Sequence, residues 1–465
     1  MRALAEAPVD GCTPLKEDAV VSSEGEKERQ HGCPDVDYLD PECEHKPDDE
    51  AGELHAHRDR HRQRPDAFEV PHTPGKAKIA PVRRTRPTLT SFSMRFEIAG
   101  TVRLALMGAD ERTERVVCRE LDPYGPIDGR GDPDLTLEAM PDLPAPIDLQ
   151  NPAADALVTA TDGNHLQLLV GGRSCTVPRL ALQGPFQLGY ERGFPLAHIF
   201  GSVVRPTIQL ALEDHNAVAV HSAGVEYDGS GIVVGGWSES GKTEAALALM
   251  ELGARFVSDK WTVVGADSSI SPFPISVGVR RWALRYLPRL RRSLPTIARA
   301  QLAVAGLAAA VTAPARARQS ENRVLEVVRA AVDKGVALAD RASVRPSDLA
   351  RAYGQSAPAV GVRLGAVVLL TTVPGPDVSA SLTDSRWGAR RLARSAAYER
   401  RAFFDLHRRA RYALPQLDDE LEGAIERREE QRLQVALRSL PVIEVKAPFP
   451  ADPRRVAEAI LARLQ

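Results

Sequence analysis

The sequence predicts an α/β protein whose core contains a mixed sheet, with a small β-rich unit before the core and a helical insertion inside it. Three observations lead to this fold class. From residue 193 onward, strand-like and helix-like runs alternate, as in chains that pack helices on a sheet. The run VRLGAVVLLTT (362–372) is continuously apolar, which is typical of a strand buried on both faces. Between 93 and 192 the apolar runs are short and broken by Gly, Pro and Asp, as strands of a β-rich unit are.

The 465 residues divide into four expected parts. Residues 1–92 are rich in Pro, His, Asp, Glu and Arg and lack aliphatic periodicity, so we expect a disordered tail. The β-rich unit (93–192) is followed by a core made of two segments, 193–279 and 360–465. Between them, 280–359 is an Ala/Arg-rich helical insertion. Its basic character indicates a solvated, arginine-rich surface, with a lid or a patch for an acidic partner as the alternatives.

The composition excludes several classes of partner. The net charge is −2, so no overall charge attracts nucleic acid, and the basic insertion lacks the interleaved aromatic residues of a nucleic-acid module. The most apolar long run, 300–313, is too short to span a bilayer, and residues 1–30 contain no signal-peptide core. We therefore expect a cytoplasmic protein without a membrane span. Cys118 and Cys175 are expected to be reduced, although they are candidates for pairing.

Turn and capping residues place the individual elements. The expected elements are a hairpin turning at Gly171–Gly172, a helical segment at 193–215 interrupted at Pro206, two strands reversing at 228–231, a helix at 245–252 ending at Gly253, strands within 254–259, 261–266 and 269–276, the strand 362–372, a polar helical stretch to about 438, a strand at 441–448 and a helix opened by Asp452 and Pro453.

The stretch GWSESGKT (236–243) carries the strongest chemical signal. It matches the phosphate-binding pattern G-x-x-x-x-G-K-[ST], follows the strand GIVVG and opens a helix. In this pattern the backbone N–H groups point inward at phosphates, the lysine contacts the terminal phosphates, and the last hydroxyl binds Mg²⁺. The alternative is a glycine-rich turn with an exposed lysine. Against it, the chain has only nine lysines, and none lies between Lys78 and Lys242.

We therefore expect ATP and Mg²⁺ at this stretch. The expected nucleotide-binding residues are Gly236, Trp237, Ser238, Glu239, Ser240, Gly241, Lys242 and Thr243. Guanine is not expected, because the chain contains no N-K-x-D element. The nearest aliphatic run ending in Asp is ARFVSD, whose Asp259 lies sixteen residues beyond Thr243. This short strand–helix–strand spacing distinguishes the chain from the common ATPase classes.

With these residues, the segment 215–275 resembles the HPr kinase/phosphorylase superfamily, which is related to phosphoenolpyruvate carboxykinase. The order of His221, Ser238, Lys242, Thr243 and Asp259 matches that family. The resemblance implies a core of the HPr kinase C-terminal type and transfer of the γ-phosphoryl group of ATP to a hydroxyl acceptor. It also implies that Asp259 acts as general base and metal ligand, that Thr243 is a metal ligand, and that Lys242 and His221 lie beside the phosphates. A buried core histidine is the alternative for His221.

Departures from the family narrow the expected substrate. Lys260 replaces the second Asp, so it either points to solvent or brings positive charge to the phosphates, and Glu239 replaces a Gly. The second family signature is missing, so HPr is not the expected acceptor, and the hydroxyl belongs to an unknown peptide, protein or small molecule. Arg280 and Arg281 are either phosphate contacts or surface residues. The alternative function is a non-catalytic, ATP-binding regulatory module.

Overall fold

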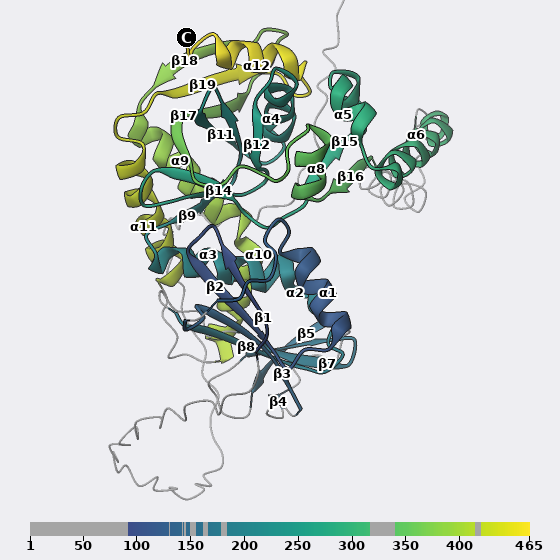
Figure 1. Cartoon of the computed structure of the whole chain (residues 1–465), viewed down its shortest axis with the longest axis vertical. Helices are drawn as coiled ribbons and strands as arrows, with labels where there is room; N and C mark the ends of the chain where they lie inside the picture. Colours follow the sequence, from purple (N-terminus) through teal and green to yellow (C-terminus); the bar gives the residue numbers. More distant parts are fainter. Residues whose placement is uncertain are drawn as a thin grey trace, which may run out of the picture. The chain divides into compact units, whose positions relative to one another are not determined.

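The computed structural model describes residues 92–129, 131–141, 143, 146–148, 155–160, 166–177, 184–316, 340–413 and 420–465. All of these residues belong to one compact unit. The expected disordered tail lies outside the described residues, apart from its last residue. The architecture is mixed α/β, as the sequence predicts (Figure 1).

The described strands form three sheets. They are β1 (Phe92–Ile98), β2 (Val102–Met107), β3 (Leu135–Met140), β4 (Pro146–Asp148), β5 (Asp155–Ala160), β6 (Leu166–Val170), β7 (Arg173–Val177), β8 (Phe186–Glu191), β9 (Val218–Val220), β10 (Ser222–Tyr227), β11 (Ser230–Gly236), β12 (Arg255–Ser258), β13 (Thr262–Val264), β14 (Ser269–Pro272), β15 (Val277–Arg280), β16 (Arg341–Val344), β17 (Val362–Thr372), β18 (Ser379–Thr383) and β19 (Val442–Ala447).

Helices separate and follow these strands. They are α1 (Glu111–Glu120), α2 (Leu196–Ile199), the π-helical turn η1 (Phe200–Val204), α3 (Arg205–Asp214), α4 (Lys242–Glu251), the 3₁₀ turn η2 (Arg281–Arg285), α5 (Pro288–Ser293), α6 (Thr296–Arg316), α8 (Pro346–Ala352), α9 (Ser385–Glu399), α10 (Arg401–Ala413), α11 (Leu421–Ala436) and α12 (Pro453–Leu461). The interruption expected at Pro206 is therefore a π-helical turn, and the helix resumes with this proline in its first turn.

The large sheet is mixed and is built around β17. Its strand order is β12-β10-β11-β17-β14-β13-β9, with β19 beside β17 and β18 beside β19. The strands β11, β17 and β19 are parallel, whereas β10, β12, β14 and β18 pair antiparallel with their neighbours. Along one edge of β17, its first residues pair with β14 and its later residues with β19.

Helices cover both faces of the large sheet. Side chains of a strand alternate between the two faces, so neighbouring residues of β17 pack against different helices. Val368 and Leu370 of β17 pack in one apolar cluster with α4 and α12. Val367 and Leu369 pack in another with α9 and α11. Figure 1 shows the two helix pairs on opposite sides of the sheet. This double burial is the reason that the strand reads as one continuous apolar run.

The first eight strands form a separate sheet in the order β1-β2-β3-β8-β7-β6-β5-β4, and β6 and β7 form the hairpin expected at Gly171–Gly172. The sequence did not predict α1, which begins after the N-cap Asp110 and buries little beyond Val117. Cys118 and Cys175 lie in this part of the chain, and both are free.

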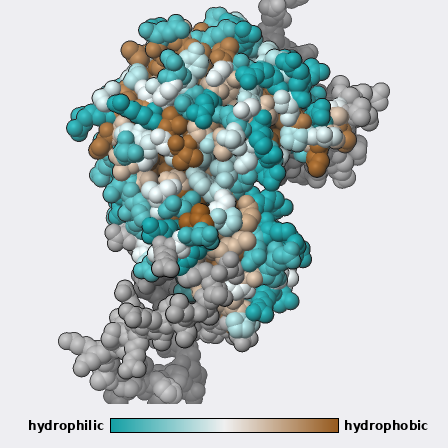
Figure 2. Space-filling view, in the orientation of Figure 1, coloured by the Kyte–Doolittle hydropathy of each residue, from teal (hydrophilic) through white to brown (hydrophobic). Residues whose placement is uncertain are grey.

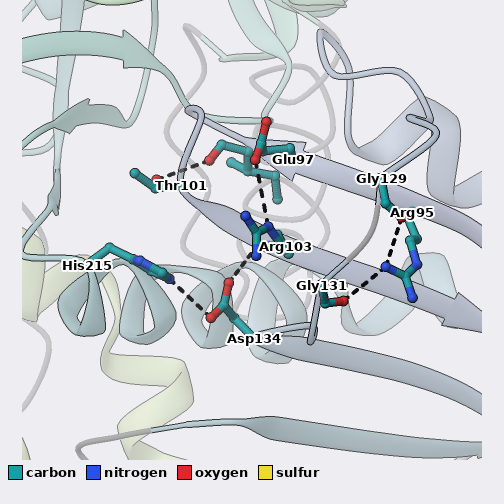
Figure 3. A network of polar contacts seen from close by, with 9 residues as sticks. Arg95, Glu97, Thr101, Arg103, Gly129, Gly131, Asp134 and His215 are labelled. Carbon is teal, nitrogen blue, oxygen red and sulfur yellow. Dashed lines mark hydrogen bonds and ion pairs between the residues drawn. The ribbon is translucent and has the colours of Figure 1, made fainter.

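Polar contacts join this sheet to the helices before the large sheet. The Asp134 carboxylate, just before β3, accepts the backbone N–H of Arg103 at 2.7 Å and lies 3.1 Å from Nε2 of His215, at the end of α3 (Figure 3). Arg205, the first residue of α3, donates to the Glu120 carboxylate at 2.9 Å and to the carbonyl of Pro274 at 2.7 Å. The contacts with Asp134 and Glu120 fix α3 against the β-rich part, and the contact with Pro274 fixes it to the loop after β14.

The insertion is not wholly helical, which corrects the expectation. Its described residues form η2, α5, α6 and α8, but β16 pairs antiparallel with β15 to make a two-stranded ribbon. A strand of four residues, RASV, is too short for its alternation to be distinguished in an Ala/Arg-rich background.

The face drawn in Figure 2 is mostly hydrophilic, with hydrophobic residues in separate patches. Within the described residues, none of the helices combines the length and the apolar character needed to cross a membrane.

Candidate functional site

The segment 236–243, here named the glycine loop, connects β11 to α4. The strand ends at Gly236 and the helix begins at Lys242, so the expected order of strand, loop and helix is present. Gly236 has φ +151° and passes so close to β17 that a Cβ would lie 2.9 Å from the carbonyl oxygen of Leu370. Only glycine fits this turn without displacing the backbone of β17.

Two further loop residues have left-handed backbone conformations. Gly241 has φ +92°, and Glu239 has φ +61°. For a non-glycine residue this conformation costs roughly 1 kcal/mol or more of free energy, and such strain is common at functional sites. The Glu239 carboxylate is exposed and accepts a 2.8 Å hydrogen bond from Arg280.

Lys242 folds back over the loop that precedes it. Its Nζ donates to the carbonyls of Gly236 at 3.1 Å and Trp237 at 2.7 Å, and its side chain is buried. Burial lowers the pKa of Lys242 to about 8, against the opposing effect of the nearby Asp259 carboxylate. The ammonium group is therefore held at the centre of the loop by backbone dipoles.

Asp259 lies beside the first turn of α4, although it follows β12 in the chain. Its Oδ1 accepts a 2.8 Å hydrogen bond from the hydroxyl of Thr243. The residue is 4% exposed, and burial raises the pKa of its carboxyl, while the Thr243 hydrogen bond and the charge of Lys242 lower it. A carboxyl with this balance of effects is suited to exchanging a proton.

His221 lies at the junction of β9 and β10 and contacts α9. Its Nδ1 is 3.0 Å from the hydroxyl of Ser395, which itself donates to the carbonyl of Gly236 at 3.3 Å. Because the serine proton is used in that bond, the histidine carries its proton on Nδ1, which leaves Nε2 as the acceptor. Burial, helped by Lys242 and Lys260, lowers the pKa of His221 to about 3, so the ring is neutral.

A pocket of about 270 Å³ brings most of the expected site residues together. It is lined by His221, Ser238, Glu239, Ser240, Gly241, Lys242, Thr243, Glu244, Asp259, Lys260, Ser276, Gly278, Arg280, Arg341, Ser343 and Glu399. We name it the loop pocket. Two expected residues do not line it. Gly236 is buried. Trp237 is 50% exposed, and its ring centroid lies 4.5 Å from that of Tyr398, with the two rings tilted by 35°.

Several pocket residues were not predicted. Glu399 of α9 lines the pocket, and its carboxylate is 3.8 Å from Nδ1 of His221; Ser395, also on α9, contacts His221 but does not line the pocket. They lie more than 150 residues from the loop in sequence, and no local pattern marks them. Of the two arginines singled out in the sequence, Arg280 lines the pocket, whereas Arg281 pairs with Asp340 outside it.

The end of α9 is held by a buried ion pair. Arg400 donates two hydrogen bonds to the Glu429 carboxylate on α11, one of them at 2.6 Å, and both residues are almost fully buried. Removing one partner would leave a buried charge unpaired at a cost of about 3–5 kcal/mol. The pair thereby fixes Glu399 and Ser395 against His221.

Oxygen ligands for a metal are few in the loop pocket. Among the described residues no group of three or more His, Cys, Asp and Glu is arranged to hold a metal ion. The hydroxyl of Thr243 and the carboxylate of Asp259 do lie together. This pair suits Mg²⁺, which usually keeps several waters and takes one or two protein ligands together with substrate phosphates.

Comparison with known proteins adds no family. Neither a protein-family model nor a curated protein matches the chain. The structure is that of a mixed α/β protein with a polar pocket at the end of β11. The proposed function therefore rests on the residues of the loop pocket.

Proposed function

We propose that the protein is an ATP-dependent phosphotransferase of the HPr-kinase-like type, which moves the γ-phosphoryl group to a hydroxyl acceptor. The observation that carries the proposal is the Thr243–Asp259 hydrogen bond within the loop pocket. It joins the last residue of the phosphate-binding pattern to a carboxylate, which is the pairing that a nucleotide-bound Mg²⁺ requires.

The glycine loop fits the phosphates of ATP in two respects. Glu239 and Gly241 have the positive φ that is typical of loops that bind phosphate through backbone N–H groups, and α4 adds the positive end of its dipole. In addition, the hydroxyl of Ser240 is buried and has no hydrogen-bond partner among the described residues. A phosphate oxygen in the loop would accept a hydrogen bond from this hydroxyl and remove the cost of leaving it unpaired.

Thr243 and Asp259 would hold Mg²⁺, with the remaining ligands from phosphate and water. The ion supplies charge neutralisation at the β- and γ-phosphates. Lys242 then stabilises the same phosphates as a fixed cation, since its Nζ is held over the loop.

Asp259 has the general-base role in the proposed reaction. Its carboxylate takes the proton from the acceptor hydroxyl while the hydroxyl oxygen forms a bond to the γ-phosphorus and the bond to ADP breaks. The raised pKa of Asp259 favours this proton transfer. Neutral His221 keeps a second positive charge away from Lys242 and orients the loop through Ser395.

The test compares Asp259→Asn with wild type in two assays, ATP binding and release or transfer of labelled γ-phosphate. A kinase should keep its ATP affinity within about tenfold and lose about 10²–10⁴-fold in turnover. The matched control is Asp228→Asn, an exposed residue in the turn between β10 and β11 whose φ of +50° Asn also tolerates. Wild-type turnover that is insensitive to Asp259→Asn would refute the proposal.

A non-catalytic, ATP-binding regulatory module is the second candidate, and Lys260 is the observation that favours it. This residue takes the place of a carboxylate and has φ +66°, so a cation is held next to Asp259 at some strain. A regulatory module would bind ATP without consuming it. The Asp259→Asn comparison separates the two functions, because a module without turnover has no rate to lose.

A further inference from the structure

The ribbon formed by β15 and β16 has two different faces. Its apolar side chains belong to the hydrophobic cluster beneath α4: Val277, Val279, Ala342 and Val344. Its other face forms one wall of the loop pocket and presents Gly278, Arg280, Arg341 and Ser343. Arg280 and Arg341 are directly opposite each other in the register of the ribbon. Like charges in this position repel, so the pairing is favourable only where anions offset it.

The positively charged side chains of the pocket differ in the hydrogen bonds and ion pairs that they form. Arg280 is engaged by the Glu239 carboxylate at 2.8 Å and lies 3.6 Å from that of Glu244. Lys242 is bonded to loop carbonyls. By contrast, within the part of the chain that the structure describes, no ion pair or side-chain hydrogen bond involves the guanidinium of Arg341 or the ammonium of Lys260.

The side chain of Arg341 crosses Gly278, its diagonal neighbour on the facing strand, where no side chain obstructs it. A Cβ on Gly278 would lie 2.6 Å from Cδ of Arg341 and 3.2 Å from its Cγ and Nε. The aliphatic stem of the arginine therefore crosses the glycine and carries the guanidinium along the pocket wall. Any other residue at this position would displace the stem.

Lys260 is near this guanidinium. Lys260 lines the same pocket and its side chain is exposed to solvent there, within reach of the charges of Arg341 and Asp259. Two cations that disfavour one another thus lie on the same pocket, next to the carboxylate assigned to the acceptor proton.

We propose that Arg341 and Lys260, with the hydroxyl of Ser343, form a subsite for an anionic group of the acceptor, a carboxylate or a phosphate ester. The acceptor would then be an acidic hydroxy compound rather than a neutral alcohol. This inference rests on the proposed function, since it names the substrate class of the same pocket. The nucleotide phosphates do not need these cations, because the glycine loop and Lys242 hold them.

The test is a calorimetric titration of inorganic phosphate into the full chain saturated with Mg²⁺ and a non-hydrolysable ATP analogue. A second titration with glycerate in place of phosphate distinguishes the carboxylate from the phosphate ester. The variants are Arg341→Gln, Lys260→Gln and the control Arg363→Gln, an exposed arginine on β17 that does not line the pocket. We expect one anion to bind wild type and the control equally, and each pocket variant to bind it about ten- to a hundredfold more weakly.

A further variant, Gly278→Ala, keeps every charge but displaces the Arg341 stem, so it should weaken anion binding while the analogue affinity and the thermal unfolding curve stay close to wild type. Anion binding that is equal in wild type and Arg341→Gln, or that displaces the analogue, would overturn the inference. If the analogue itself fails to bind, the proposed function fails. The same titrations without it still show whether Arg341 and Lys260 hold an anion.

Discussion

The hydroxyl of Thr243 donates a 2.8 Å hydrogen bond to Oδ1 of Asp259, which joins the first turn of α4 to the end of β12. The two residues are sixteen positions apart in the chain. Because Asp259 is almost fully buried, this bond satisfies a carboxylate that water reaches poorly. The proposed kinase activity depends on this pair.

Replacing Thr243 by Val removes the hydroxyl and keeps the shape. We expect the gain in ATP affinity produced by Mg²⁺ to fall about tenfold, the effect of one lost charge-assisted bond. Calorimetry with Mg²⁺ and with EDTA measures this gain. Thr372→Val, at the exposed end of β17, is the control and should behave as wild type. An unchanged Mg²⁺ effect in Thr243→Val would show that this hydroxyl is not a metal ligand.

The affinity for ATP should depend on pH through Lys242. With its pKa at about 8, the ammonium is charged below that pH and loses its proton above it. Affinity should therefore fall as pH rises beyond 8, by up to about tenfold per unit. Titrations from pH 7 to 9.5 measure the slope, and Lys242→Met should bind weakly with a flat profile over the same range. Equal slopes in both proteins would assign the pH dependence to another group.

Glu239→Gly should both stabilise the protein and tighten ATP binding. The substitution relieves the backbone strain of the φ of +61°, which amounts to about 1 kcal/mol of stability. It also removes a carboxylate from the loop and frees Arg280 from its hydrogen bond to that carboxylate. Ser268→Gly is the matched control, because Ser268 has φ +58° and does not line the pocket. The control should gain stability alone. If Glu239→Gly binds ATP less tightly, the carboxylate has a positive role in the site.

His221 should make the protein less stable in acid. Its folded pKa of about 3 is below the ordinary value of 6.5, so the unfolded chain binds the proton more readily. Above pH 6.5 the group has no effect; below it, stability falls by at most about 1.4 kcal/mol per unit until pH 3. Urea unfolding at several pH values should give a flatter curve for His221→Gln, whereas the exposed His198→Gln should follow wild type.

Local sequence patterns predicted the elements around the loop pocket. The apolar run of β17, the order of β11, loop and α4, and the opening of α12 at Asp452 and Pro453 all have signals within a few residues. The strand β18 was missed because its five residues, SASLT, are small and largely exposed. The helix α1 was missed because it has a narrow apolar face in a polar sequence.

The glycine loop and Asp259 were found because their chemistry requires particular residues at particular spacings. Glu399 and Arg341, which line the pocket, and Ser395, which contacts His221, were not, since the fold brings them there from distant elements. Their placement depends on the packing of α9 against β11 and on the pairing of β15 with β16. Neither contact has a signature in a single sequence.

The most direct test of the account is an experimental structure of the chain with Mg²⁺ and a non-hydrolysable ATP analogue. The account predicts the triphosphate on the backbone N–H groups of the glycine loop, with the Asp259 carboxylate within one hydroxyl or water of the terminal phosphoryl. A triphosphate bound elsewhere, or one whose terminal phosphoryl faces away from Asp259, would contradict it.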